Sequence, residues 1–304
     1  MDLKQLAALV AVAEHRSFSA AARALHTVQS NVSTHVAHLE RELGVTLVDR
    51  SAGELTEEGR VVVERARRVQ SELEALVSDV AAVHDEISGT VRAGIIGTTA
   101  RWLSPPLLEA MAASYPDVRL VILDATTTSL LPQLSNGQID LAVVNTPLDD
   151  PEVEVAPLFD EDRLLVVPAG HPLQERDEVS FEELANHELL LPASGTAFRE
   201  ELDRFAAEAG VKLATKAEVD GMRLLASLAF SGFGAAILPA SATPGWVGGD
   251  WKRIPVPGLP GRSVGLAHRR RGLPSAAERA LRDTLQAVVR EQAPEQPGIY
   301  PVAG

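Results

Sequence analysis

Short polar side chains gather on one side of a predicted helix within residues 25–40. They are Gln29, Ser30, Ser33 and Thr34, followed one turn later by His38. These types suit hydrogen bonding to base edges in a DNA major groove, because Gln pairs with adenine through two hydrogen bonds and Ser or Thr serves any base. Solvated helices more often carry Lys and Glu, which favour helix formation more than Ser, Thr or His do. A polar helix start in any α-helical domain is the alternative.

A second group of polar side chains follows predicted strands, just before or at the start of predicted helices. The group consists of Thr98, Thr99, Thr126, Ser194, Thr196, Asp220 and the adjoining Met222. Hydroxyl and N–H groups at helix N-termini, beyond the carboxyl ends of parallel strands, form a site for a small carboxylate or another anion. Asp220 would instead favour a cationic or amine-bearing ligand. Ordinary N-capping is the alternative for each residue taken alone.

Other chemistry finds little support in the sequence. The chain has no cysteine, which excludes disulfides, thiol catalysis and thiol redox sensing. It contains no nucleophile elbow, phosphate-binding loop or zinc-protease motif, and no His, Asp or Glu cluster with metal-ligand spacing. We therefore expect no enzyme activity, no metal and no cofactor. An α/β enzyme with an appended helical domain is the least favoured alternative.

The helix that carries the first polar group belongs to a compact N-terminal segment, residues 1–58. Apolar spacing predicts helices over residues 3–13 and 20–25, with Ser19 as N-cap of the second, and a tight turn at His26 and Thr27. Thr27 is expected to cap the third helix, which Gly44 ends. Two short extended pieces follow, near residues 47–48 and 54–55. The order predicts a helix-turn-helix followed by a small hairpin.

Residues 59–88 predict one long helix with a dimerisation seam. Eight apolar residues, of which Ile87 is the last, follow each other at spacings of 4, 3, 4, 3, 4, 3 and 4. This is the a/d pattern of a coiled coil. A core helix of a globular domain is the alternative. The seam residues expected to contact a partner helix are Val62, Ala66, Val69, Leu73, Leu76, Val80 and Val83.

After Gly89 the pattern alternates between strands and helices up to residue 292. This alternation predicts parallel sheets covered by helices. Its two similar halves predict a bilobed unit, with lobe I at about 89–161 and 266–292 and lobe II at about 162–265. The chain is expected to cross between the lobes near residues 160–164 and 262–266. Three prolines in residues 293–304 predict a loose tail.

Bulk composition is that of a globular protein, with 45% hydrophobic and 23% charged residues in a chain of 304. The longest apolar run near the N-terminus falls far short of a bilayer span and no signal peptide is recognisable, so we expect a cytoplasmic protein without membrane contact. The net charge is −14. Residues 1–60 hold six Lys or Arg against eight Asp or Glu. We therefore expect weak non-specific DNA binding and affinity that depends on two or more domains together.

Residues 1–50 resemble the winged helix-turn-helix of LysR-type transcriptional regulators. The matching residues are Leu6, Ala11-Val12-Ala13, Ser17-Phe18, Ala21-Ala22, Leu25, Gln29, Ser33, Leu39-Glu40, Leu43-Gly44, Leu47 and Arg50, followed by Leu55-Thr56 and Gly59. The resemblance continues through the long helix into a bilobed domain like a periplasmic binding protein, with supporting matches at residues 137–144, 170–173 and 232–239. It implies an α+β multi-domain fold: a winged helix-turn-helix, a long linker helix and a bilobed α/β effector domain.

The resemblance also implies roles and partners. Gln29, Ser30, Ser33 and Thr34 would contact bases, while Arg50 and Ser51 would lie at the wing and contact the DNA backbone. The protein would be a sequence-specific regulator of transcription, assembled as a homodimer and then a homotetramer and controlled by a small-molecule effector between the lobes. RNA polymerase is a further candidate partner. An effector-independent, architectural DNA-binding protein is the alternative.

Three departures from the family pattern affect this prediction. The wing is shortened to residues 51–54 and carries the carboxylate of Glu54. Ser30 stands where the family often has Pro, and Thr34 stands where it often has Arg, which removes one positive charge. The absence of cysteine also excludes the peroxide-sensing branch of the family, which switches by disulfide formation.

Overall fold

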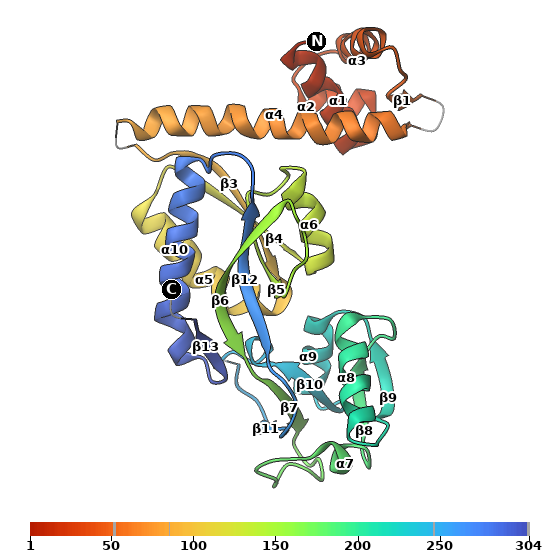
Figure 1. The fold of residues 1–304 in the computed structure, drawn as a ribbon, viewed down its shortest axis with the longest axis vertical. Coiled ribbons are helices and arrows are strands. Elements are labelled where there is room, and N and C mark those ends of the chain that lie inside the picture. Colours follow the sequence, from red (N-terminus) through yellow and green to blue (C-terminus); the bar gives the residue numbers. More distant parts are fainter. Residues whose placement is uncertain (51–52, 85, 246, 303–304) are drawn as a thin grey trace.

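The computed structural model of the chain describes residues 1–50, 53–84, 86–245 and 247–302. Figure 1 shows an elongated molecule in which the N-terminal domain lies at one end and lobe II at the other. The long helix α4 runs across the molecule between the N-terminal domain and lobe I. The candidate DNA-contacting residues and the candidate effector residues therefore lie in separate parts of the chain.

The N-terminal domain packs three helices against the start of α4. Its elements are α1 (Leu3–His15), α2 (Phe18–Ala24), α3 (Gln29–Leu43), β1 (Val48–Asp49) and β2 (Glu54–Leu55). The core contains the fully buried Leu9, Val36 and Leu39, which recur at helical spacing. Val48 pairs with Leu55 in the small antiparallel hairpin.

The helix ends correct two predicted caps. Ser17, and not Ser19, is the N-cap of α2, and its hydroxyl accepts from the Ala20 N–H at 3.3 Å. The N-cap of α3 is Val28, and the Thr27 hydroxyl accepts from the side chain of Asn31 at 3.0 Å instead. The predicted end of α3 is confirmed, because Gly44 adopts the left-handed conformation with φ of 72°.

Helix α4 (Glu57–Ala82) is shorter than predicted and ends at Ala82 rather than near residue 88. Thr56 is its N-cap and accepts from the Gly59 N–H. Close packing requires glycine at position 59, because a Cβ there would lie 2.0 Å from the carbonyl oxygen of Leu47. This close approach fixes the start of α4 against the small hairpin.

Lobe I is built on a six-stranded mixed sheet with order β13-β6-β12-β5-β3-β4. Its strands are β3 (Gly89–Ile96), β4 (Val118–Ala125), β5 (Leu141–Thr146), β6 (Val153–Glu161), β12 (Arg262–Arg269) and β13 (Ile299–Pro301). Its helices are α5 (Gly97–Ser114), α6 (Thr127–Ser135) and α10 (Ala276–Gln292). Strands β3, β4 and β5 are parallel, as predicted, whereas β6, β12 and β13 are antiparallel.

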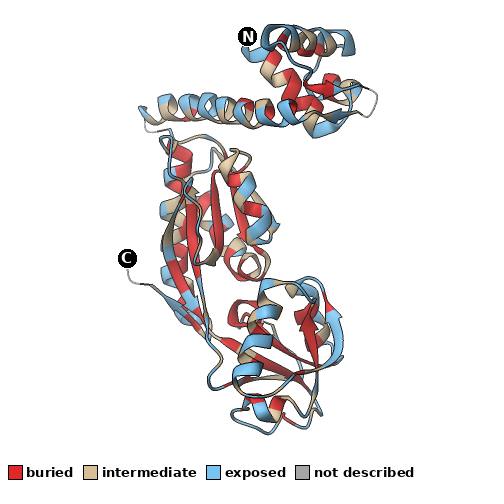
Figure 2. Cartoon of the chain, turned by 45° about the vertical axis from the view of Figure 1, so that its right-hand side comes forward, coloured by how far each residue is buried: buried red, intermediate tan, exposed pale blue. Residues whose placement is uncertain are grey.

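Lobe II is built on a five-stranded mixed sheet with order β11-β7-β10-β8-β9. Its strands are β7 (Arg163–Pro168), β8 (Glu188–Pro192), β9 (Ala214–Val219), β10 (Ala235–Pro239) and β11 (Trp251–Pro255). Its helices are α7 (Phe181–Leu184), α8 (Ala197–Glu208), α9 (Met222–Phe230) and the 3-10 turn η1 (Ala240–Ala242). Figure 2 shows buried strands at the centre of each lobe. Lobe I has one hydrophobic core, whereas the lobe II sheet contributes to two.

Two features contradict the sequence-based expectations. The prediction of parallel sheets missed β6 and β11, which pair antiparallel with their neighbours. The predicted loose tail is wrong for residues 293–302: Ala293 and Ile299 are buried, β13 pairs with β6, and the Val302 N–H donates to the Leu158 carbonyl. Burial of these apolar side chains outweighs the turn-forming preference of the three prolines.

Candidate functional site

Helix α3 presents its predicted polar residues to the outside of the molecule. Gln29, Ser30, Thr34 and His38 are exposed and Ser33 is half-buried. The opposite face is fully buried, with Val32, Val36 and Leu39 at 0% exposure. Because the apolar face anchors the helix, the polar side chains occupy a surface that a duplex can approach.

Two hydrogen bonds tie this polar surface to its surroundings. The Ser19 hydroxyl donates to Gln29 Oε1 at 2.8 Å. Arg50 Nη1 donates to Ser33 Oγ at 3.1 Å, and the same guanidinium lies 3.7 Å from a carboxylate oxygen of Glu40. Arg50 also lies over the Phe18 ring, 5.4 Å from its centroid. The wing arginine is therefore held beside α3.

Sequence reasoning missed two exposed residues at the start of α3. Val28 is 59% exposed, and Asn31 is exposed beside it. An exposed valine at this place suits the methyl group of thymine. Val28 also has no side-chain oxygen to cap the helix, so the first N–H groups of α3 lack a side-chain partner. The only sequence signal was an apolar residue just before the polar group.

The described part of the wing carries two acidic residues. Asp49 pairs with Glu54 across the hairpin, and the Gly53 N–H donates to the Asp49 carbonyl at 2.8 Å. Ser51, predicted to contact the DNA backbone, lies outside the described residues. Glu54 is exposed, which places a carboxylate on the described part of the wing.

The predicted seam of α4 divides into two parts. Ala66 is buried in the core of the N-terminal domain, where α1 lies against this part of α4, so its predicted contact with a partner helix is wrong. Val62 is only partly buried against the same core, and its contact with a partner helix stays a prediction. The remaining seam residues are exposed in the single chain: Val69, Leu73, Leu76, Val80 and Val83. Their exposure rises from 38% at Val69 to 80% at Val83. An unpartnered apolar row of this length is typical of a protein interface.

A cluster of buried polar groups joins the two lobes at the hinge. Arg262 Nε donates to Glu161 Oε1 at 2.6 Å, and Arg262 Nη2 donates to Thr98 Oγ1 at 2.7 Å and to Ser241 Oγ at 3.1 Å. The Ser241 N–H donates to the second oxygen of Glu161 at 2.6 Å. Glu161 is only 1% exposed. We call these four residues the hinge cluster.

A second contact joins the lobes at the surface. Arg223 of α9 forms an ion pair with Asp124 at the end of β4. Gly97 makes room for it, since a Cβ there would lie 2.8 Å from Asp124 Oδ1. Arg101 of α5 lies 6.0 Å from the ring centroid of Phe230 in α9. Apolar contacts also join the lobes, because Ala240 of η1 lies in the lobe I core and Leu164 of β7 packs against it.

The predicted effector residues of lobe I differ in accessibility. Thr98 is 4% exposed and is already bonded to Arg262. Thr99 is fully buried, and its hydroxyl has no partner among the described atoms, so in this conformation it contacts no effector. Thr126 is exposed and caps α6. Trp102, considered as a lining residue, is a core side chain packed edge-on against Phe159.

The predicted effector residues of lobe II lie at the starts of α8 and α9. The exposed Ser194 Oγ donates to Glu218 at 2.9 Å, and its N–H donates to the same carboxylate at 3.1 Å. Thr196 caps α8. Asp220 is exposed, while Met222 packs against the lobe II core. Glu218 and its partner Arg199 were missed, because neither belongs to a predicted strand end.

The Glu218 carboxyl beside Ser194 is stabilised in its charged form. The N–H and hydroxyl of Ser194, with Arg199, hold the pKa of the exposed Glu218 carboxyl below its usual range. Glu218 is therefore ionised at neutral pH and keeps Ser194 oriented.

Among residues 1–50, 53–84, 86–245 and 247–302, no group of three or more His, Cys, Asp or Glu is placed to hold a metal ion. In the same residues, no helix combines the length and apolar character of a membrane span.

Comparison with known proteins extends over nearly the whole chain. Residues 3–60 match the family model "Bacterial regulatory helix-turn-helix protein, lysR family", and residues 84–290 match the model "LysR substrate binding domain". The chain is 36% identical over 299 residues to a probable hydrogen peroxide-inducible genes activator of Streptomyces viridosporus, covering 95% of this chain and 94% of the relative. It is 31% identical over 277 residues to the DNA-binding transcriptional dual regulator OxyR of Escherichia coli, covering 88% and 90%.

A solved structure of full-length OxyR from Pseudomonas aeruginosa has a TM-score of 0.74 and 27% identity, covering 95% of each chain. The sequence-based exclusion of the peroxide-sensing branch therefore needs correction: the chain is similar to proteins named for that response, although it has no cysteine with which to form a disulfide.

Two matched family models, the fold and the relatives lead to one conclusion. The chain belongs to the LysR family of DNA-binding transcriptional regulators, with an N-terminal helix-turn-helix and a C-terminal effector-binding domain.

Proposed function

We propose that α3 enters the DNA major groove and that Gln29, Ser30 and Thr34 hydrogen-bond to base edges. The observation that supports this most is the separation of the helix into a buried apolar face and an opposite face on which Gln29, Ser30 and Thr34 are exposed. Short side chains let the helix approach the bases closely. His38, one turn further, would contact bases or backbone at the far side of the same surface.

Arg50 and Ser33 would act as a pair. Ser33 Oγ and Glu40 position the Arg50 guanidinium beside α3, where it can donate to a phosphate oxygen of the DNA backbone. Ser51 is proposed as a neighbouring backbone contact on sequence grounds alone. We add Val28 as a contact to a thymine methyl group and the free N–H groups at the start of α3 as phosphate donors.

The test begins with genomic fragments retained by the protein, from which an operator is defined. In Gln29→Ala we expect operator affinity to fall by about 10- to 100-fold, because a bidentate base contact contributes about 1–3 kcal/mol. Affinity for unrelated DNA should change little, since Gln29 carries no charge. Gln133→Ala, in α6 of lobe I, is the matched control. Equal loss of operator and unrelated DNA binding in Gln29→Ala would show that Gln29 does not contact bases.

We further propose that α4 joins two chains into a dimer through Val69, Leu73, Leu76, Val80 and Val83. These exposed seam residues would be removed from water by the same face of a second α4. A dimer places two α3 helices on one duplex, which compensates for the weak electrostatic attraction expected of an acidic protein. Assembly of two dimers into a tetramer is part of the same proposal.

The effector is proposed to bind between the lobes, near Ser194 and the Arg223–Asp124 ion pair. Because these groups carry both charges, a small molecule with an anionic or amine group could replace one partner of each contact. Thr98, Thr126, Thr196, Asp220 and Met222 remain candidates around it. A thiol switch is unavailable to a chain without cysteine, so control by a bound molecule is the mechanism that the residues favour.

Thermal unfolding with small carboxylates and amines tests the effector proposal. A ligand that binds the native state raises the unfolding midpoint in a concentration-dependent way. We expect such a rise in the wild type and its loss in Ser194→Ala, whose missing hydroxyl lies at the surface. Ser227→Ala, an exposed serine of α9, serves as control. If no compound of either class stabilises the protein, the effector-independent alternative is favoured.

A further inference from the structure

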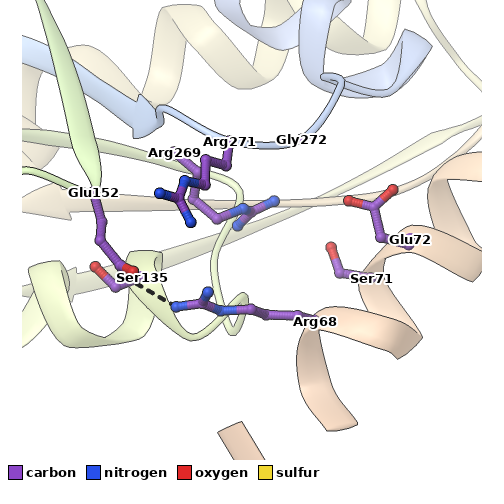
Figure 3. Close-up of a pocket in the computed structure, with 8 residues that line it drawn as sticks. All are labelled: Arg68, Ser71, Glu72, Ser135, Glu152, Arg269, Arg271 and Gly272. Atoms are coloured by element: carbon purple, nitrogen blue, oxygen red, sulfur yellow. Dashed lines mark hydrogen bonds and ion pairs between the residues drawn. The ribbon is translucent and has the colours of Figure 1, made fainter. Parts of the chain in front are cut away.

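A cavity lies between the linker helix α4 and lobe I, away from the polar face of α3 and from the region between the lobes. Its volume is about 190 Å³. Figure 3 shows the residues that line it, which come from α4, from the end of β12 and the loop after it, from the end of α6 and from the position before β6. They are Arg68, Ser71, Glu72, Ser135, Glu152, Arg269, Arg271 and Gly272. We call this the junction cavity.

The three arginines of the junction cavity are held to different extents. Arg68 of α4 donates to Glu152 at 3.0 Å across the junction and to Glu64 at 3.1 Å within its own helix. Arg269 Nη1 donates to the carbonyl oxygens of Leu134 and Ile139. Arg271 is exposed and forms no hydrogen bond or ion pair with any described residue. One complete guanidinium therefore remains for a ligand.

An adjoining cavity of about 220 Å³ continues the basic surface. Arg269, Arg270, Arg271 and Arg282 line it, against the carboxyl groups of Glu72 and Glu278. Burial raises the pKa of Glu278 to about 7, so this group carries only part of a negative charge at neutral pH. In the junction cavity itself, Glu152 already neutralises Arg68. Asp140 lies 3.9 Å from Arg269, Asp283 lies 3.2 Å from Arg282, and Glu72 lines both cavities. Among the described residues, the guanidinium groups of this surface that form no ion pair are therefore those of Arg270 and Arg271.

We propose that the junction cavity binds a small oxyanion, a phosphate or a carboxylate group, through the guanidinium of Arg271. A planar guanidinium offers two parallel N–H donors that match the geometry of such groups. The hydroxyls of Ser71 on α4 and Ser135 at the end of α6 line the same space from opposite sides. The bound anion joins α4, which carries the DNA-contacting domain, to the lobe that carries the effector residues.

The position of this site gives it a regulatory role. The described contacts between α4 and lobe I are mainly polar, such as Arg68 with Glu152 and Arg92 with Glu74. Exposed ion pairs of this kind contribute about 1 kcal/mol or less each, so the angle between α4 and lobe I is weakly fixed. An anion that contacts both sides restricts this angle and thereby the placement of the DNA-contacting domain relative to the effector domain.

Titration calorimetry on the full-length protein tests the proposal, with inorganic phosphate in one arm and succinate in the other, at constant ionic strength. We expect saturable binding of at least one of them to the wild type. Arg271→Gln should weaken it by about ten-fold or more, since it removes a charge-assisted bidentate contact. Arg290→Gln, an exposed arginine at the far end of α10, should bind like the wild type.

Each outcome decides the proposal. Binding of phosphate alone, or of succinate alone, supports it and identifies the group recognised. Absence of saturable binding of both anions overturns it, as does equal weakening in Arg271→Gln and Arg290→Gln, which would indicate general charge screening. Because Arg271 is exposed, its replacement should leave the unfolding midpoint unchanged without anion. Ser194→Ala should retain anion binding, which separates this site from the proposed effector site between the lobes.

Discussion

Two buried carboxylates lie where separate parts of the chain meet. Glu161, in the hinge cluster, has its charge compensated by Arg262 and by the Ser241 N–H. Glu278, in the first turn of α10, has no comparable ion pair among the described residues, and burial is the largest influence on it. A buried carboxylate without a close partner favours its protonated form. Burial of Glu278 is therefore expected to make the stability of the protein depend on pH.

We predict that Glu278→Gln stabilises the protein at alkaline pH. The folded-state pKa of Glu278 is raised to about 7 from an ordinary value of 4.5, so its favourable contribution is complete below the unfolded-state pKa and is lost as pH rises through 7. Relative to the wild type, the variant should gain about 3 kcal/mol in free energy of unfolding near pH 8, and much less near pH 5. Urea unfolding at both pH values measures this difference.

The exposed Glu291, on the same helix, supplies the control. Glu291→Gln should change the free energy of unfolding little and equally at the two pH values. A gain in Glu278→Gln that does not depend on pH would mean that the glutamine packs better, and that the ionisation of Glu278 is not the cause.

At the scale of elements, α4 serves two partners with one continuous apolar pattern. Ala66 is buried against the N-terminal domain, whereas Leu73 is 41% and Leu76 58% exposed. A different side of the same helix faces lobe I. Ser78 on that side is buried, and its hydroxyl donates to the Ser88 carbonyl. One helix thus contacts the DNA-contacting domain, lobe I and, by our proposal, a second chain.

We predict that Leu73→Glu combined with Leu76→Glu converts dimers into monomers. Both carboxylates would be buried in the proposed interface, where an unpaired charge is strongly unfavourable. Light scattering at matched concentrations measures the mass in solution. The control is Val61→Glu, on the same helix outside the seam, at a position that is 59% exposed in the single chain. Dimers that persist in the double variant would place the interface elsewhere.

At the scale of the whole molecule, the two lobes are joined by the crossing strands, by the hinge cluster, by the packing of Ala240 in the lobe I core and by the Arg223–Asp124 pair. The hinge cluster lies next to the points where the chain crosses, at β6 to β7 and at β12. The Arg223–Asp124 pair lies farther out, with the Arg223 side chain 64% exposed and that of Asp124 26% exposed. The hinge cluster is therefore suited to a fixed pivot, and the outer pair to a contact that opens.

We predict that Arg223→Ala shifts the lobes toward a wider separation. The pair is exposed, so it contributes about 1 kcal/mol or less, and its loss should change the ratio of open to closed forms by about five-fold at most. The chain has no cysteine, so spin labels on Glu109→Cys and Glu200→Cys report the distance between lobe I and lobe II alone. Pulsed electron spin resonance gives the distribution of that distance.

The exchanged pair, Arg223→Asp with Asp124→Arg, is the control, because it keeps an ion pair of opposite direction at the same place. It should restore the wild-type distribution. Identical distributions in the wild type and Arg223→Ala would show that the outer pair does not determine the lobe arrangement.

The sequence by itself determined the features that depend on local periodicity. The helical spacing of Val32, Val36 and Leu39 specified which face of α3 is buried, and left Gln29 and Thr34 outside. Most strands and helices of both lobes also followed from apolar runs and turn residues. These patterns arise within a few residues, where side-chain direction and backbone preference are fixed by neighbours along the chain.

Only the tertiary structure decided which distant segments meet. Glu161 and Arg262 are 101 positions apart, Arg68 and Glu152 are 84 apart, and nothing in either local sequence indicates the other. Tertiary packing also divided the seam of α4 and turned the proline-containing tail into strand β13. The reason is physical: such contacts depend on how whole elements pack and on which charges burial brings together, and a periodic pattern records only that a face is apolar.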